Sequence, residues 1–367
     1  MSAKVQNPYK LVALDMDGTL LNSHHEVSER TKYVLQCLLQ RGVHVIFATG
    51  RPFTDVFRVK KHLNIFGTKS EALPVADGVR PRCFSITTHG TCIYDEHNEK
   101  VYEQVIHPDT CKALYHLVDV TPEVNLNVYR TVTKEEVASP TYHNPSDLGT
   151  APEERATEEW IARHPAEMEA LIYESTKFTY RTVDSVEQFS TENVNEIFFL
   201  SEDKKKVREV ENQIRVFVQQ NDAAVGADKE DPSAQPHGVS RSVRVAPSAE
   251  YCVDILPGKV SKASSIAYIL QELQLTFADT IAFGDGLNDL EMLTSVAKGF
   301  VMGNANERVK HILLGKNEEE IMKTEGAHYC TFTKKAQGCE LIGTNDEDGV
   351  ATKLAEIFGI DLSNAPK

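Results

Sequence analysis

The sequence predicts an α/β protein, in which a parallel sheet flanked by helices carries a second, inserted α+β domain. Three observations support this. Short apolar runs at 11–14, 43–48 and 280–283 each lead into polar or glycine-containing turns, as buried parallel strands do. Helical periodicity separates the first two runs, so they form a βαβ unit with a right-handed crossover. Between about residues 105 and 254 this alternation gives way to mixed strands, helices and long polar segments.

The first segment of the chain alternates strands and helices. Apolar residues recur at helical spacing from Ser28, a favourable N-cap, to Gly42, a typical helix stop. The elements expected here are a strand at 11–14, a helix at 28–40, a strand at 43–48, a helix from Phe53, a strand at 83–88 and a hairpin at 94–102.

The middle of the chain predicts the inserted α+β domain. The elements expected are helices at 108–118, 153–162 and 203–219 and strands at 126–130, 178–181, 196–200 and 241–245. The alternation of strands and helices then returns, with helices expected at 261–273, 290–296 and 351–358 and strands at 280–283 and 299–302. The expected division is a core at 1–104 and 255–367 and an inserted domain at 105–254. Segments rich in turn-forming or polar residues predict insertions at 67–82, 139–165, 223–240 and 310–340.

Composition narrows the class of partner. A formal net charge of −15 over 367 residues argues against nucleic acid or an anionic membrane. The seven cysteines form no Cys-x-x-Cys pair, so we expect a reduced, cytoplasmic protein without a zinc site. No apolar run reaches the roughly 18 residues that a membrane span needs, and the polar segment 1–10 does not resemble a secretory signal.

Two carboxylates follow the first predicted strand. Asp15 and Asp17 flank a single residue, and Gly18 follows them. In an open α/β sheet, ligands bind at the carboxyl ends of the strands. Two acids there are costly unless a cation or a reaction uses them. We therefore predict that Asp15 attacks a phosphorus atom and that Asp17 transfers the proton.

Other polar groups are expected at the same edge of the sheet. Thr49 and Gly50 follow the second strand, Lys262 opens a predicted helix, and Asp285 and Asp289 follow the strand at 280–283. Mg²⁺ binds carboxylates, waters and phosphate oxygens, and a lysine adds positive charge to a transferred phosphoryl group. A carboxylate held in line can act as the nucleophile. The set predicts phosphoryl transfer.

Four segments, in this order, carry a family resemblance: DMDGTLL at 15–21, ATGR at 48–51, GKVSK at 258–262 and GDGLND at 284–289. With them, the sequence resembles the haloacid dehalogenase (HAD) superfamily, and within it the Cof-type phosphatases with a type IIB cap. The resemblance implies a Rossmann-like parallel sheet of strand order 5-4-1-2-3 with an αββ-type lid. It also implies a Mg²⁺-dependent phosphatase that forms an aspartyl-phosphate.

The resemblance implies a role for each matching residue. Asp15 matches the nucleophile and a Mg²⁺ ligand, and Asp17 matches the general acid and base, whose backbone carbonyl is a second metal ligand. Lys262 matches the lysine that neutralises nucleophile and phosphate. The other implied roles are phosphate binding by Thr49 and Gly50, metal binding by Asp285, an outer metal-site acid at Asp289, hydrogen-bonding support by Asn288 and close backbone approach at Gly18.

Several alternatives stay open. Lys259 lies three residues before Lys262 and could reach the site instead. Arg51 is either a structural ion-pair partner or a substrate contact. His89 stands where many relatives have asparagine, so it is either a substrate contact or a turn residue.

The expected substrate is a small phosphorylated metabolite, with a sugar phosphate favoured. The alternatives are a pyridoxal-phosphate phosphatase, a sugar phosphomutase and an inactive metabolite-binding regulator. We expect a monomer or a small homo-oligomer.

Overall fold

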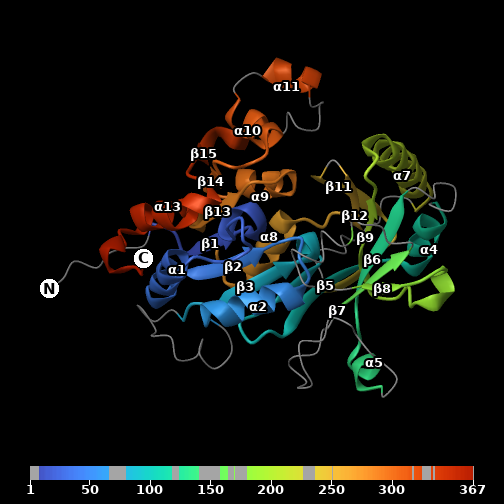
Figure 1. Ribbon diagram of the computed structural model, residues 1–367, viewed down its shortest axis with the longest axis horizontal. Coiled ribbons are helices and arrows are strands. Elements are labelled where there is room, and N and C mark those ends of the chain that lie inside the picture. The colour runs from blue at the N-terminus through green and yellow to red at the C-terminus, as the bar shows by residue number, and fades with distance from the viewer. Residues whose placement is uncertain are drawn as a thin grey trace.

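The computed structural model describes residues 8–65, 80–117, 124–139, 158–163, 169, 180–225, 236–249, 251–315, 318–324, 332–333 and 335–366. Its strands form one continuous sheet that runs through two parts of the molecule (Figure 1). We call the part that contains both chain ends the core, and the part built from the middle of the chain the cap. No helix in the described residues is long and apolar enough to cross a membrane.

The core has the predicted parallel sheet. Its strands are β1 (Leu11–Leu14), β2 (His44–Ala48), β3 (Cys83–Thr87), β13 (Thr280–Gly284), β14 (Lys298–Val301) and β15 (Glu340–Leu341). They lie side by side in the order β15-β14-β13-β1-β2-β3, and each neighbouring pair is parallel. The implied 5-4-1-2-3 order is therefore confirmed, with β15 as one further edge strand. β1 is completely buried, as its uninterrupted apolar sequence predicts.

Helices cover both faces of the core sheet (Figure 1). The core helices are α1 (Glu29–Gln40), α2 (Phe53–Leu63), α8 (Lys262–Glu272), α9 (Leu290–Ser295), α10 (Glu307–Leu314) and α13 (Gly349–Phe358), and α11 (Glu318–Thr324) lies beyond α10, away from the sheet (Figure 1). The predicted start of α1 is confirmed, because the Ser28 hydroxyl accepts a hydrogen bond from the Thr31 amide at 3.0 Å. Ser261 caps α8 in the same way through the Ser264 amide, so Lys262 stands at the first helical position.

The cap continues the sheet with mostly antiparallel strands. β4 (Cys92–Tyr94) and β5 (Lys100–Ile106) lead out of the core as the predicted hairpin, and β12 (Cys252–Pro257) leads back. The other cap elements are β6 (Asn125–Thr131), β7 (Glu158–Arg163), β8 (Tyr180–Thr182), β9 (Val194–Leu200), β10 (His237–Ser240), β11 (Val243–Ala249), α4 (Pro108–Leu117), α5 (Lys134–Ala138) and α7 (Lys204–Val225). α4 and α7 lie on the side of the cap sheet away from the core (Figure 1).

Period-2 alternation gives the cap sheet two different faces. Ile197 and Phe199 of β9 point into one buried apolar cluster together with Val253 and Ile255 of β12. The alternate residues of the same strands point to the opposite face, which borders the pocket described below. β9 and β12 therefore each have a core face and a pocket face.

The helix predicted at 153–162 is wrong where the structure describes it. Residues 158–163 form β7, which pairs with β6 from Thr131↔Glu158 to Leu126↔Arg163. Glu158 and Glu159 are buried and find distant partners: Glu159 binds Arg130, and Glu158 accepts hydrogen bonds from the amides that open α2. Only contacts with residues far away in the sequence satisfy these two buried acids in the strand.

The predicted insertions are partly structured. β7 lies within 139–165, the end of α7 and β10 lie within 223–240, and the end of α10, all of α11 and the start of β15 lie within 310–340. Most of 67–82 falls outside the described residues.

The largest apolar clusters of the core and of the cap are separate from each other. One contains residues between Leu11 and Tyr102 and between Ile266 and Ile360, and the other contains residues between Ile106 and Ile255. The predicted boundaries at 104/105 and 254/255 fall inside β5 and β12, and this division stays a prediction.

Candidate active site

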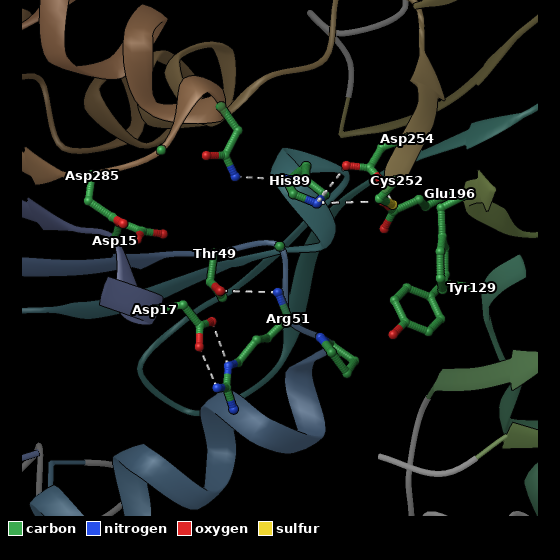
Figure 2. Close-up of a pocket in the computed structure, with 15 residues that line it drawn as sticks. Asp15, Asp17, Thr49, Arg51, His89, Tyr129, Glu196, Cys252, Asp254 and Asp285 are labelled. Atoms are coloured by element: carbon green, nitrogen blue, oxygen red, sulfur yellow. Dashed lines mark hydrogen bonds and ion pairs between the residues drawn. The ribbon is translucent and has the colours of Figure 1, made fainter. Parts of the chain in front are cut away.

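A pocket opens where the carboxyl ends of the core strands meet the cap sheet. Its cavity volume is about 280 Å³, just below the usual range for small-molecule sites, so it suits a small ligand. The predicted residues that line it are Asp15, Asp17, Thr49, Gly50, Arg51, His89, Asp285 and Asn288 (Figure 2). The cap adds lining residues that were not predicted: Tyr129, Glu196, Phe198, Cys252 and Asp254.

Three carboxylates and one ammonium form the core end of the site. Oxygens of Asp15, Asp285 and Asp289 lie within 4.8 Å of one another. The buried Lys262 ammonium donates hydrogen bonds to Asp15 Oδ1 at 2.6 Å and to Asp289 Oδ1 at 2.7 Å. Lys259 is exposed, whereas Lys262 is buried and contacts the carboxylates directly, so Lys262 is the lysine that reaches them.

Asp289 organises the loop after β13. Its Oδ2 accepts hydrogen bonds from the amides of Asp285 at 3.0 Å and Gly286 at 2.9 Å, while its Oδ1 holds Lys262. The Thr19 hydroxyl donates to Asp285 Oδ1 at 3.1 Å. Both oxygens of Asp289 thus already have partners, which leaves Asp15 and Asp285 as the carboxylates best placed to bind a cation.

Lys262 supplies one positive charge to the three carboxyl groups of Asp15, Asp285 and Asp289. Burial, and then the neighbouring charge of Asp289, raise the pKa of Asp15 well above its usual value. The same two causes raise the pKa of Asp285 to about 6. One ammonium cannot neutralise three carboxylates in a buried place, and an added divalent cation would favour their ionised forms. The donor set, all hard carboxylate oxygens, fits Mg²⁺.

Asp17 points away from this cluster toward Arg51 (Figure 2). The Arg51 Nε donates to Asp17 Oδ2 at 2.7 Å and a second guanidinium nitrogen binds Oδ1, which makes a bidentate pair. Burial alone would raise the pKa of Asp17, but the hydrogen bonds and charge of Arg51 outweigh it and lower this pKa. The Asp17 side chain is 48% exposed, so solvent screens part of this effect.

Two glycines allow close approach in the site. Gly18 has φ +70°, and a Cβ there would lie 2.4 Å from Asp285 Oδ2. A Cβ on Gly50 would lie 2.4 Å from the imidazole ring of His89. Beside Gly50, the Thr49 hydroxyl accepts a hydrogen bond from the Arg51 amide at 3.0 Å.

His89 links the core loop to the cap. Its backbone is left-handed with φ 57°, and its Nδ1 lies 3.3 Å from Asn288 Nδ2. Its Nε2 lies 3.5 Å from Glu196 Oε1 and 3.7 Å from Asp254 Oδ2. Burial lowers the pKa of this imidazole. The sequence offered no signal for Glu196 and Asp254 beyond the alternation of their strands.

Comparisons with known proteins identify relatives of this chain. A model of the haloacid dehalogenase-like hydrolase family matches residues 12–315. A relative in Enterobacter sp. (strain 638), named HMP-PP phosphatase, is 26% identical over 298 residues, covering 81% of this chain and 85% of that protein.

Two solved structures share the fold. A haloacid dehalogenase-like hydrolase from Bacteroides thetaiotaomicron has a TM-score of 0.64 at 23% identity, with 95% of this chain and 99% of that chain covered. A HAD subclass IIB sugar phosphatase has a TM-score of 0.62 at 20% identity, covering 96% of this chain and 100% of that one. The predicted fold and the predicted class, a phosphomonoester hydrolase of this superfamily, are confirmed. The chain belongs to the haloacid dehalogenase-like hydrolase family.

Proposed function

We propose that the protein is a Mg²⁺-dependent phosphatase that hydrolyses a small phosphorylated metabolite, with a sugar phosphate as the favoured class. The observation that carries the proposal is the Lys262 ammonium held between Asp15 and Asp289 beside Asp285. This arrangement supports a nucleophilic carboxylate next to positive charge, which phosphoryl transfer needs. The pocket volume of about 280 Å³ supports a small substrate.

Asp15 is the proposed nucleophile. One of its carboxylate oxygens forms a bond to phosphorus while the bond from phosphorus to the ester oxygen breaks, and the alcohol leaves with a proton from Asp17. Water then attacks the phosphorus of the aspartyl-phosphate, Asp17 takes a proton from that water, and phosphate leaves Asp15. Lys262, Thr49 and the Gly50 amide hold the phosphoryl oxygens.

Asp17 must change partners during this cycle. Its bidentate pair with Arg51 favours the ionised form, which suits the base of the second step. The first step needs a protonated Asp17 near the leaving oxygen, so substrate binding has to weaken the pair with Arg51. Arg51 is therefore proposed as a positioning residue for Asp17.

Asp15 and Asp285 would hold Mg²⁺, with the Asp17 backbone carbonyl as a further ligand and Asp289 as the outer acid. The bound ion would neutralise charge on phosphoryl oxygens and on the carboxylates. Asp289 would keep the loop of Asp285 in place through the two amides it binds. A cytoplasmic location remains a prediction from cysteine usage.

The test is turnover of p-nitrophenyl phosphate with Mg²⁺ by Asp15→Asn. We expect the rate to fall by about a thousandfold or more, because the amide cannot form the covalent intermediate. The exposed cap residue Asp184 provides a matched control, Asp184→Asn, which should keep wild-type turnover. EDTA should abolish the wild-type rate and added Mg²⁺ should restore it.

Retained turnover in Asp15→Asn would refute the mechanism. Product analysis with phosphorylated metabolites, including pyridoxal phosphate, separates the alternatives: free phosphate indicates hydrolysis, whereas an isomerised sugar phosphate indicates a mutase. A protein that binds these metabolites and turns over none of them is a regulator.

A further inference from the structure

Two buried acids in the cap have no role in the proposed chemistry. We call Glu196 of β9 and Asp254 of β12 the cap acid pair. They lie across the pocket from Asp15 and Asp285 (Figure 2), on the side where the alcohol part of a substrate would lie.

The strand register places the cap acid pair on the pocket face. β9 and β12 are antiparallel neighbours, with Asp254 opposite Phe198. Glu196 is two residues from Phe198, so it projects from the same face as a diagonal neighbour of Asp254. Both residues are nearly inaccessible, with 2% of Glu196 and 3% of Asp254 exposed. The fold therefore holds two carboxyl groups side by side against the cavity.

Each member of the cap acid pair has one buried oxygen without a hydrogen-bond partner among the described residues, while Asp254 Oδ1 accepts a hydrogen bond from the Cys252 thiol at 3.0 Å. Glu196 Oε2 and Asp254 Oδ2 accept no hydrogen bond from any residue that the structure describes. His89 Nε2 approaches both acids but stays 3.5 and 3.7 Å away. Buried acceptors without donors are costly, and native proteins rarely keep them except for a ligand or ion.

The arginines near the cap acid pair form ion pairs with other acids. Among the described residues that line the pocket, Arg51 is the only lysine or arginine, and it pairs with Asp17. Arg244 on the neighbouring strand β11 binds Glu291 at 3.3 Å. His89 can supply at most one positive charge against two carboxyl groups. The alcohol end of the pocket is therefore short of positive charge.

We propose that the cap acid pair is a binding subsite for a cationic amino group on the alcohol part of the substrate. This rests on the proposed function and names its substrate class: phosphate monoesters of amino sugars or of amine-bearing heterocycles. An ammonium offers three donors and a full charge to two buried acceptors, which gives short, charge-assisted hydrogen bonds. A neutral hydroxyl satisfies the pair less well, and a second phosphate or a carboxylate would be repelled.

The test compares substrates that differ in one group. Glucosamine 6-phosphate and glucose 6-phosphate exchange an amine for a hydroxyl, and so do pyridoxamine 5′-phosphate and pyridoxine 5′-phosphate. We expect kcat/KM of the wild-type enzyme with Mg²⁺ to favour the amine by about tenfold or more in at least one pair. Glu196→Gln and Asp254→Asn should move that ratio toward one, whereas Glu135→Gln, at an exposed position of α5, should leave it unchanged.

Two outcomes would overturn the subsite. One is a ratio within twofold of one for the wild type in both pairs, or a preference that both cap variants retain. The other is a second Mg²⁺ or Zn²⁺ site, found by calorimetry with the metal alone and lost in Glu196→Gln, because the pair would then hold a metal ion. p-Nitrophenyl phosphate distinguishes failure of the subsite from failure of the proposed function. If the enzyme hydrolyses this ester but shows no preference for amine-bearing substrates, only the subsite is refuted. If it hydrolyses no ester at all, the proposed function is refuted.

Discussion

Lys262→Met is the substitution whose consequences the structure specifies most fully. Lys262 is 1% exposed, and its ammonium is the group that joins Asp15 to Asp289. Methionine keeps much of the side-chain volume and removes the charge. The variant would leave three neighbouring carboxylates at the end of the core sheet without their shared cation.

The expected loss of stability is large. Removing one partner of a buried ion pair costs about 3–5 kcal/mol, because the remaining charge stays buried and unpaired. The loss should shrink as pH falls. A carboxyl group with a raised folded-state pKa, such as Asp285 at about 6, contributes stability at low pH that is lost as pH rises through that value. Without Lys262 the pKa values of Asp15 and Asp285 rise further, so the loss of unfolding free energy should be greater at pH 8 than at pH 5.

Urea unfolding followed by circular dichroism measures this effect at both pH values, with and without Mg²⁺. Mg²⁺ should stabilise Lys262→Met, because an ion that binds only the folded state shifts the unfolding equilibrium. Lys259→Met is the control: its side chain is exposed, and we expect a change below about 0.5 kcal/mol. A loss below about 1 kcal/mol in Lys262→Met, or an equal loss at pH 5 and pH 8, would refute the reasoning.

Two further predictions concern Gly18 and Glu158. Gly18→Ala should raise the Mg²⁺ concentration needed for half-maximal turnover by about tenfold, because the added Cβ would displace Asp285. Gly359→Ala, also at positive φ but with open space around its Cβ, is the control and should leave that concentration unchanged. Equal effects of the two substitutions would argue against the contact between Gly18 and Asp285. Burial raises the pKa of Glu158 from 4.5 to about 7, so its stabilising contribution is present below pH 4.5 and lost as pH rises through 7. Unfolding free energies of the wild type relative to Glu158→Gln should therefore fall by up to about 3 kcal/mol across that range, and a flat difference would contradict the burial argument.

The local sequence was sufficient to predict the features of the fold that depend on residues close together in the chain. The apolar run of β1 and the cap of α1 by Ser28 depend on nearby residues, and both were predicted. Strand ends in a parallel sheet meet at one edge, so the convergence of Asp15, Thr49 and Asp285 also followed from the order of strands and helices. The core end of the site, which we propose binds phosphate, could therefore be predicted without tertiary structure.

The cap could not be predicted to the same depth. A helix was expected at 153–162, but residues 158–163 form β7, and the partners of Glu158 and Glu159 come from α2 and from Arg130, far away in sequence. Which residues of β9 face the pocket depends on its register with β12, since one step along a strand exchanges its two faces.

The sequence by itself determined the family, the parallel core and the order of the residues proposed for phosphoryl transfer, because those features lie in short motifs at strand ends. The tertiary structure alone decided that Arg51 holds Asp17, that Asp289 holds Lys262, and that Glu196 and Asp254 meet above the pocket. Each of these contacts joins segments far apart in the chain. Their existence depends on packing and strand register, which no local pattern encodes.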